Sequence, residues 1–194
     1  MNIRDFRTPE YKVEELILSR WSPRAMSGEP IAREELLSLF EAARWAPSAF
    51  NNQPWRFLYA LRDTDNWPAF FDALVEFNQG WCRNAAALIV IAAHKFFEMN
   101  GKPADTHAFD TGMAAANLAL QGNALNLVVH FMAGYDEVKV RAALGIPEDY
   151  AIMAMAALGR PGLAEDLPKD LQEKEQPSGR KAIRDLAYEG PFPT

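Results

Sequence analysis

The chain has few of the residues that stabilise secreted or metal-dependent domains. Cys82 is the single cysteine among 194 residues, so no internal disulfide can form. Histidine occurs only three times, and the spacing of Asp105, His107 and Asp110 matches no standard metal site. A chain of this length buries about 70% of the surface that its unfolded form exposes. We therefore predict one domain that folds without disulfides or metal, in a reducing compartment such as the cytoplasm.

Positive charge and long apolar stretches are also scarce. Lys and Arg total 20 against 26 Asp and Glu, and the basic residues form no run. Nucleic-acid binding needs a basic excess on one face, so this balance argues against it. The longest strongly apolar stretch, residues 85–93, is about half of what a spanning helix needs, and the N-terminus is acidic where an export signal would be apolar. We expect neither a nucleic-acid partner nor a membrane partner.

Several catalytic motifs are missing as well. No two glycines lie two positions apart, which excludes the G-x-G-x-x-G fingerprint, and no G-x-x-x-x-G-K-[ST] loop occurs. Ser48 has no G-x-S-x-G setting, and Cys82 has no neighbouring base in the sequence. A Rossmann domain, a P-loop enzyme and covalent catalysis are therefore not expected.

Helical and strand patterns alternate along the chain. The apolar spacing predicts helices over residues 10–19, about 32–46, from 68 through 75, from 107 to about 127, and 136–144. Strands are predicted over residues 55–61, 86–93, 128–135 and 151–158. Pro23, Gly28 and Pro30 favour an extended path over residues 20–30. These patterns indicate an α+β or α/β fold with a sandwiched sheet.

Two segments have an unusual composition. The helix predicted from residue 107 is rich in Gly and Ala, which suits either close packing in the core or a subunit interface. Residues 163–181 carry nine charges in nineteen positions, together with Pro168 and Pro177. This composition favours an extended arm at the C-terminal end.

Four short motifs are candidates for a binding site. Arg20, Ser22 and Arg24 alternate in an extended stretch and so share one face, where two guanidinium groups and a hydroxyl suit a phosphate dianion. The alternative is a solvated basic turn. Residues 47–55, P-S-A-F-N-N-Q-P-W, carry amide side chains whose donors and acceptors suit a pyrimidine-like edge, or are turn formers only.

The other two motifs lie later in the chain. Gly134 ends a predicted strand, where a glycine lets the backbone approach a ligand and direct an N–H group at it; a plain turn is the alternative. Residues 178–181, S-G-R-K, add a basic pair, for which a solvent-facing position is the simpler interpretation.

Together the motifs resemble the nitroreductase family of flavoproteins. The resemblance rests on R-W-S-P-R, A-A-R-W-A-P-S-A-F-N-N-Q-P-W, A-F-D-T-G-M-A-A-A-N-L-A-L, H-F-M-A-G-Y-D and L-G-R-P-G, and it spans residues 20–181. It implies an α+β fold with a central, mostly antiparallel sheet flanked by helices, assembled as an intertwined homodimer with FMN in two interface sites. The expected domain covers residues 1–194, with 163–194 as a C-terminal extension.

The resemblance also implies roles for individual residues. The phosphate and ribityl group would contact the residues around Arg20 and Arg24, with Arg180 or Lys181 closing the phosphate from the arm. The loop after Pro47 would come from the partner subunit to line the ring, supported by Gln53. The implied cofactor-binding residues are Arg20, Trp21, Ser22, Arg24, Pro47, Ser48, Ala49, Asn51, Gln53, Phe131, Met132, Ala133, Gly134, Arg180 and Lys181.

The implied activity is FMN-dependent oxidoreduction. NADH or NADPH would pass hydride to flavin N5, near the backbone of Ala133 and Gly134, and an electron-poor acceptor such as a nitroaromatic or quinone would be reduced by a ping-pong mechanism. No side chain is indicated as an acid or base. Relatives differ at Phe131 and Ala133, which bears on the substrate. The alternatives are a specialised chemistry (enone reduction, dehalogenation or flavin fragmentation), a non-catalytic flavin-binding protein, or a helical docking module without a ligand.

Overall fold

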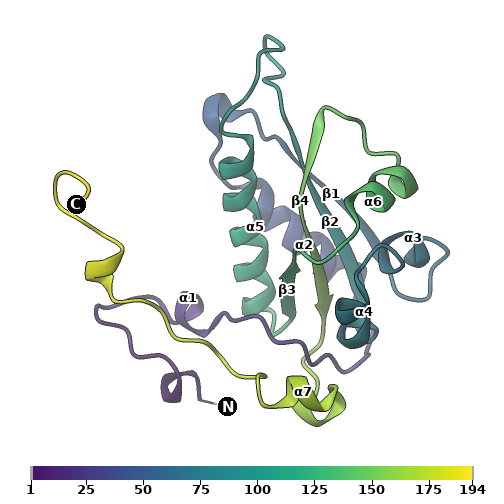
Figure 1. Ribbon diagram of the computed structural model, residues 1–194, viewed down its shortest axis with the longest axis vertical. Helices are drawn as coiled ribbons and strands as arrows, with labels where there is room; N and C mark the ends of the chain where they lie inside the picture. The colour runs from purple at the N-terminus through teal and green to yellow at the C-terminus, as the bar shows by residue number, and fades with distance from the viewer. Residues whose placement is uncertain (1, 194) are drawn as a thin grey trace.

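The fold is built on a four-stranded antiparallel sheet, seen in a computed structural model that describes residues 2–193 (Figure 1). Met1 and Thr194, the ends of the predicted domain, lie outside the described residues. The strands are β1 (Trp55–Leu61), β2 (Ala87–His94), β3 (Val128–Met132) and β4 (Tyr150–Gly159), in the order β1-β2-β4-β3. All three neighbouring pairs are antiparallel. The predicted α+β fold with an antiparallel sheet is confirmed; the homodimer stays a prediction.

Helices surround this sheet and connect its strands. The α-helices are α1 (Glu15–Ser19), α2 (Arg33–Arg44), α3 (Trp67–Phe71), α4 (Glu76–Cys82), α5 (His107–Ala124), α6 (Glu137–Leu144) and α7 (Lys169–Gln172). Short 3₁₀ turns are η1 (Ile3–Asp5), η2 (Ala49–Asn51), η3 (Ala164–Asp166) and η4 (Ile183–Asp185).

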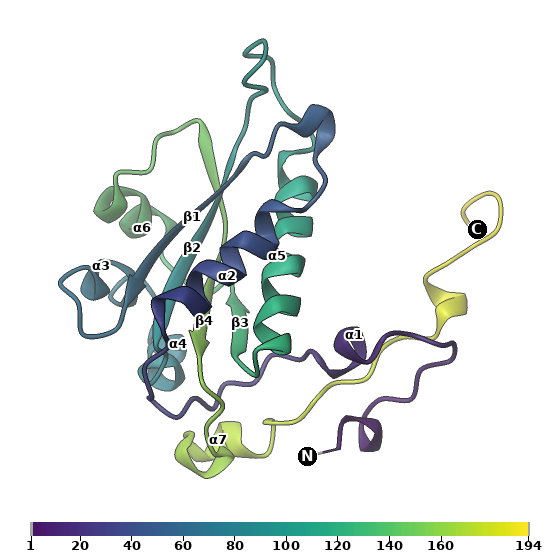
Figure 2. The same ribbon diagram turned by 180° about the vertical axis from the view of Figure 1, so that it is seen from behind.

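The central strand β2 separates two apolar clusters. Its run of buried residues faces both ways because successive side chains of a strand point to opposite faces. Ile89 and Ile91 pack in the cluster formed with α2 and α5. Leu88 and Val90 pack in the cluster formed with α3, α4 and α6. Figure 2 shows α2 and α5 on one face of the sheet and α3 and α6 beyond it. The helices therefore cover both faces of the sheet.

The long helix α5 uses its small residues to lie close to the sheet. Ala114, Ala119 and Gly122 are buried, and a Cβ added at Gly122 would lie 2.5 Å from Cγ2 of Val129 on β3. Core packing thus explains the small residues on the side of α5 that faces the sheet. Gly112, on another side, is exposed in the single chain and remains available to a partner. Core packing therefore applies to one side of α5, and a subunit interface on the other side stays a prediction.

Two predicted helices are shorter in the structure. The first begins at Glu15 rather than Glu10, because its apolar stripe finds no core in this chain: Val13, Leu16 and Ile17 are all exposed. The predicted helix from 68 through 75 ends at Phe71.

A pairing between distant segments ends that helix early. The N–H of Asp136 donates to the carbonyl of Ala73 (2.7 Å), and the N–H of Val75 donates to the carbonyl of Gly134 (3.1 Å). Once the backbone of residues 73–75 is engaged in these bonds, it cannot continue the helix. The separate helix α4, which the sequence did not predict, begins directly after it.

The two ends of the chain leave the body of the domain together. The N-terminal segment and the C-terminal arm run side by side away from the sheet in both views (Figures 1 and 2). Apart from α7 and the 3₁₀ turns, the arm is extended, as its composition predicted. Apolar side chains on these two segments, such as Tyr11 and Phe192, are 71% and 84% exposed. The single chain therefore leaves a considerable apolar surface uncovered.

We predict that Gly122→Ala destabilises the fold, because its Cβ would overlap Val129 in a packed core. Overpacking of this kind costs about 1–3 kcal/mol of unfolding free energy, measurable by urea denaturation. Gly80→Ala is the matched control, since Gly80 lies in α4 with no atom near its Cβ position. The control should be neutral or more stable by up to about 1 kcal/mol. Equal stability of the two variants would contradict the packing argument.

Candidate functional site

The arginine loop at residues 20–24 presents cationic groups without acidic partners. Nη1 of Arg20 lies 3.3 Å from Oγ of Ser22, so these two side chains share a side of the loop as predicted. Nε of Arg24 is buried and has no hydrogen-bond partner among the described residues. Within residues 2–193, neither arginine forms an ion pair. The loop therefore offers its positive charge to an anion.

Trp21 points to a different place from these side chains. Together with Pro23 it lines a cavity of about 420 Å³ that also includes Asn126 and Pro161. This alternation is that of an extended chain, in which odd and even residues face opposite ways. Any contact of Trp21 with a ligand held by Arg20 and Ser22 would therefore come through its backbone.

The backbone of the loop is held by two residues that the motif does not include. Glu175 is 8% exposed, and its Oε1 accepts the N–H groups of Arg24 (2.6 Å) and Ala25 (2.8 Å). Nδ1 of His130 on β3 lies 2.9 Å from the carbonyl oxygen of Pro23. Because a carbonyl only accepts, Nδ1 carries the proton. These bonds join the loop to the arm and to the sheet.

The G-R-P-G motif secures the same loop from the end of β4. The N–H of Ser27 donates to the carbonyl of Arg160 (3.1 Å), and the N–H of Gly162 donates to that of Ala25 (3.0 Å). A Cβ on Gly162 would lie 2.6 Å from the backbone carbon of Met26. Glycine is therefore needed here for close approach of two backbones, a reason that the motif alone does not reveal.

The arm brings Arg180 to the arginine loop. Burial first, and then the charge of Arg180, lower the pKa of Arg20 below its ordinary value. Arg180 and Lys181 are both exposed, and both line a cavity of about 450 Å³ between the N-terminal segment and the arm. Of the two predicted alternatives, only Arg180 has a charge that acts on the pKa of Arg20.

The loop after α2 adopts a strained conformation. Phe50, Asn51 and Gln53 have φ angles of 53°, 54° and 47°, which non-glycine residues rarely adopt. Oγ of Ser48 accepts the N–H of Gln53 (3.0 Å), and the Gln53 side chain donates to the carbonyl of Asn51 (3.0 Å). Gln53 therefore bonds within the loop at both its backbone and its side chain, and its role beside a cofactor stays a prediction. Pro47, at the start of the loop, is exposed. Such over-determined strain is frequent at functional sites.

Two further residues hold this loop and were not predicted to do so. Asp110, 3% exposed on α5, accepts the N–H of Ala49 (3.1 Å) and the hydroxyl of Thr106 (3.0 Å) through Oδ2. Asn52 donates to the carbonyl of Phe96 (3.2 Å) and accepts the N–H of Glu98 (3.0 Å). The loop is thus attached both to α5 and to the segment that follows β2.

The end of β3 leaves two backbone amides available. The carbonyl of Ala133 accepts from Tyr135 (3.1 Å), and that of Gly134 accepts from Val75 and from Nδ2 of Asn78 (2.9 Å). By contrast, the N–H groups of Ala133 and Gly134 donate to no backbone carbonyl of residues 2–193. That these N–H groups are directed at a ligand stays a prediction.

Packing decides how the other residues of this strand contribute. A Cβ on Gly134 would lie 2.6 Å from Nδ2 of Asn78, so a glycine is required by α4. The side chains of Phe131 and Met132 pack in the two apolar clusters. The side chain of Met132 is therefore withdrawn from a ligand at the edge of the sheet, whereas that of Phe131 is partly exposed. Asn78 could not be found from the sequence, since α4 was not predicted.

The predicted site residues form two groups at opposite ends of α5. Asp110 holds the loop of residues 47–53 near the N-terminal end of α5, whereas Asn123 near the other end donates to the carbonyl of Leu16, close to the arginine loop. These two α5 residues are about 20 Å apart along the helix axis, at 1.5 Å per residue. One chain therefore does not bring the two groups together.

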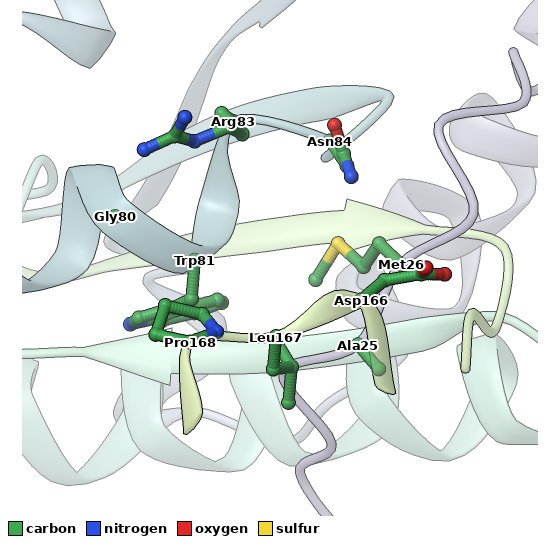
Figure 3. A pocket seen from close by; sticks show the side chains of 9 residues that line it. All are labelled: Ala25, Met26, Gly80, Trp81, Arg83, Asn84, Asp166, Leu167 and Pro168. Carbon is green, nitrogen blue, oxygen red and sulfur yellow. The ribbon is translucent and has the colours of Figure 1, made fainter. Parts of the chain in front are cut away.

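The other cavity and the other reactive groups offer fewer binding or catalytic features than the predicted site. Figure 3 shows a cavity of about 210 Å³ beside Trp81 and Arg83, and no predicted site residue lines it. Burial raises the pKa of the Cys82 thiol to about 12, which keeps it protonated and unreactive. Within residues 2–193 there is no cluster of three potential metal ligands. None of the helices in the same range is both long and apolar enough to cross a bilayer.

We predict that Asp110→Ala loosens the loop of residues 47–53. Removing the carboxylate leaves the partly buried hydroxyl of Thr106 and N–H of Ala49 without their acceptor, which costs about 1–3 kcal/mol of unfolding free energy. Urea denaturation and hydrogen exchange at the Ala49 amide would measure both effects. Asp105→Ala, at an exposed neighbouring position, should leave both unchanged. If the Ala49 amide of the Asp110→Ala variant exchanged its hydrogen at the wild-type rate, the carboxylate would not be what holds the loop.

We predict that His130 makes the stability fall in mild acid. Burial is the main cause that lowers its pKa below the ordinary value, and the charge of Arg24 adds to it, against the bond to Pro23. As the pH drops below about 6.5, the unfolded chain takes up a proton that the folded chain resists, so stability is lost toward the folded pKa. His130→Asn should lose less stability between pH 7.5 and pH 5.5, measured by thermal unfolding. Identical losses in both proteins would exclude this role.

Comparison with known proteins places these observations in a family. The model of the Nitroreductase family matches residues 17–76 and 60–160. A protein of Archaeoglobus fulgidus, whose name combines NADH dehydrogenase with NAD(P)H nitroreductase, is 31% identical over 75% of this chain and 83% of its own length. An NADH dehydrogenase of Thermus thermophilus is 31% identical over 74% of this chain and 84% of its own.

A solved structure agrees with both relatives. The crystal structure of an oxidoreductase containing FMN is 42% identical and superposes with a TM-score of 0.93, covering 96% of each chain. The family match extends over most of the residues that carry the resemblance, including the arginine loop, the loop after α2 and the end of β3. The chain belongs to the nitroreductase family.

Proposed function

We propose that this protein is an FMN-dependent oxidoreductase that uses NADH or NADPH to reduce an electron-poor acceptor such as a nitroaromatic or a quinone. Two features along β3 carry the proposal. The arginine loop beside this strand has cationic groups without ion-pair partners, and the backbone N–H groups of Ala133 and Gly134 beyond its end have no backbone acceptor. The FMN in the 42% identical relative supports the same cofactor here.

The arginine loop fits the phosphate end of FMN. The buried, unpartnered Nε of Arg24 needs an acceptor, and the side chains of Arg20 and Ser22 lie together nearby in the same loop. Arg180 adds positive charge from the arm. A phosphate dianion would provide acceptors for several of these donors through charge-assisted hydrogen bonds. These residues would hold the phosphate and the adjoining ribityl chain.

The end of β3 fits the flavin ring. Ala133 and Gly134 lie three and four positions beyond His130, which contacts the arginine loop, so they are about 10–13 Å farther along the strand direction at 3.3 Å per residue. Their free N–H groups would donate to the ring near its N5 atom. The bond from Asn78 to the carbonyl of Gly134 orients the backbone that carries these groups.

Completion of the site by a second copy is part of the proposal. The loop containing Pro47, Ser48, Ala49 and Asn51 lies at the far end of α5 and does not reach the arginine loop of its own chain. The exposed apolar residues of the N-terminal segment and arm provide surface for a partner to cover. In a homodimer, the loop of one protomer would line the ring held by the other.

The protein would act by positioning the cofactor rather than by proton transfer. Bound FMN would supply the redox chemistry at its N5 atom, which carries hydride from NADH or NADPH to the acceptor in ping-pong order. The backbone amides at the end of β3 would orient the ring, and the arginines would anchor it. Cys82 takes no part because its thiol is buried and protonated.

The proposal is tested by purification and anaerobic reduction. We expect a yellow dimer that releases FMN on denaturation and is bleached rapidly by NADH or NADPH. Reoxidation by a nitroaromatic or a quinone would support a broad reductase. Reoxidation by neither, with rapid bleaching, would point to a specialised chemistry. Bound FMN that neither nucleotide reduces would contradict the proposed activity, and a colourless monomer that does not take up FMN would contradict the proposal altogether.

We predict that Arg24→Ala weakens the binding of FMN by about 1.5–3 kcal/mol, because the phosphate loses a charge-assisted partner. The dissociation constant is measured by fluorescence titration of apoprotein. Arg44→Ala is the matched control, since Arg44 is exposed and pairs with Glu41 on the surface of α2. An unchanged FMN affinity in the Arg24 variant would place the phosphate elsewhere.

A further inference from the structure

Arg7 is a buried arginine outside every motif of the proposed site. It is 8% exposed although it belongs to the projecting N-terminal segment. Its Nε donates to the carbonyl of Ser178 (3.0 Å), and its Nη1 donates to the carbonyls of Leu18 (2.7 Å) and Arg20 (2.8 Å). One guanidinium group thus joins the N-terminal segment, the end of α1 and the C-terminal arm.

The acceptors of Arg7 belong to the backbone that carries the proposed phosphate ligands. The carbonyl of Arg20 lies in the arginine loop itself. The carbonyl of Ser178 accepts from Nη1 of Arg180 (3.2 Å) as well as from Arg7. Arg7 therefore contacts the main chain at Arg20 and, on the arm, shares an acceptor with Arg180.

No carboxylate lies within ion-pair distance of this cluster among the described residues; the nearby carboxylate of Glu175 binds backbone N–H groups instead. Arg7, Arg20 and Arg180 form no ion pair there. Burial, followed by the charges of Arg180 and Arg20, lowers the pKa of Arg7. Three guanidinium groups close together with neutral acceptors repel one another, and a dianion placed between two of them relieves that repulsion.

We infer that Arg7 is a positioning residue for the cofactor phosphate: it aligns Arg20 and Arg180 as two sides of one clamp and makes the site select FMN over riboflavin. The inference builds on the proposed function, since it assumes a flavin in this site. Arg7 lies upstream of all the motifs, and the clamp also affects the arm. A phosphate that bridges Arg20 and Arg180 would fasten the arm to the body, whereas riboflavin would not.

The first test compares two flavins on apoprotein. FMN and riboflavin are titrated by fluorescence into wild-type protein, Arg7→Met, Arg7→Lys and Arg4→Met. Arg7→Met should weaken FMN binding at least tenfold and change riboflavin binding less than twofold. Arg7→Lys keeps the charge without the fork of donors, so its preference for FMN should lie between those of wild type and Arg7→Met.

Arg4→Met is the matched control for this test. Arg4 belongs to the same segment but is exposed and pairs with Glu15 of α1 (2.7 Å). Both affinities should stay within twofold of wild type. An Arg7→Met protein that loses both flavins equally would show a merely structural role. An unchanged FMN preference would overturn the inference as well.

The second test uses the wild-type protein and does not depend on folding of a variant. Trypsin is added to apoprotein alone, with FMN or with riboflavin at saturation, and fragments are identified by mass. FMN should slow cleavage after Arg180 and Lys181 at least tenfold, and riboflavin less than twofold. Equal protection by both flavins would contradict the clamp. If wild-type protein binds neither flavin, the proposed function fails instead, which separates the two outcomes.

Discussion

Positive charge held without a carboxylate partner is the constraint on which the candidate site depends. Buried guanidinium groups are tolerated in proteins when their donors are satisfied and their charge is balanced. Here Arg7 satisfies its donors on backbone carbonyls, no guanidinium group of the cluster forms an ion pair within the described residues, and Nε of Arg24 lacks even an acceptor. The fold therefore holds an arrangement that an anion would complete. Glu175 and His130 keep the loop in place by binding its backbone rather than its guanidinium groups.

The second constraint is the length of α5. This helix packs against the sheet through small buried residues, and it separates the arginine loop from the loop of residues 47–53. Both loops belong to the motifs of one family, yet a single chain keeps them far apart. In the proposed homodimer, association of two chains would satisfy this geometry and would also cover the apolar side chains of the projecting segments. The same helix thus stabilises the fold and explains why the proposed site needs a partner.

Local signals in the sequence predicted the strands well and some helices poorly. The apolar run of β2 predicts a fully buried strand because no surface element has that composition. The helix predicted through Val75 ends early because residues 73–75 pair with residues 134–136, which lie some sixty positions away. The first helix is short because its apolar stripe stays exposed in the single chain, although α1 contacts α5 through Asn123. Both errors come from contacts that periodicity does not record.

For the site, the sequence by itself determined the chemical groups: the alternating Arg20, Ser22 and Arg24, the amide-rich loop and the glycine after β3. These groups follow from residue type and from the geometry of an extended chain, which act over a few positions. Only the tertiary structure decided what holds them. Asp110, Asn78 and Arg7 act on backbone atoms of segments distant in sequence. A hydrogen bond to a carbonyl or an amide imposes no pattern on its partner's side chain, so such supports are visible only when the chain is folded.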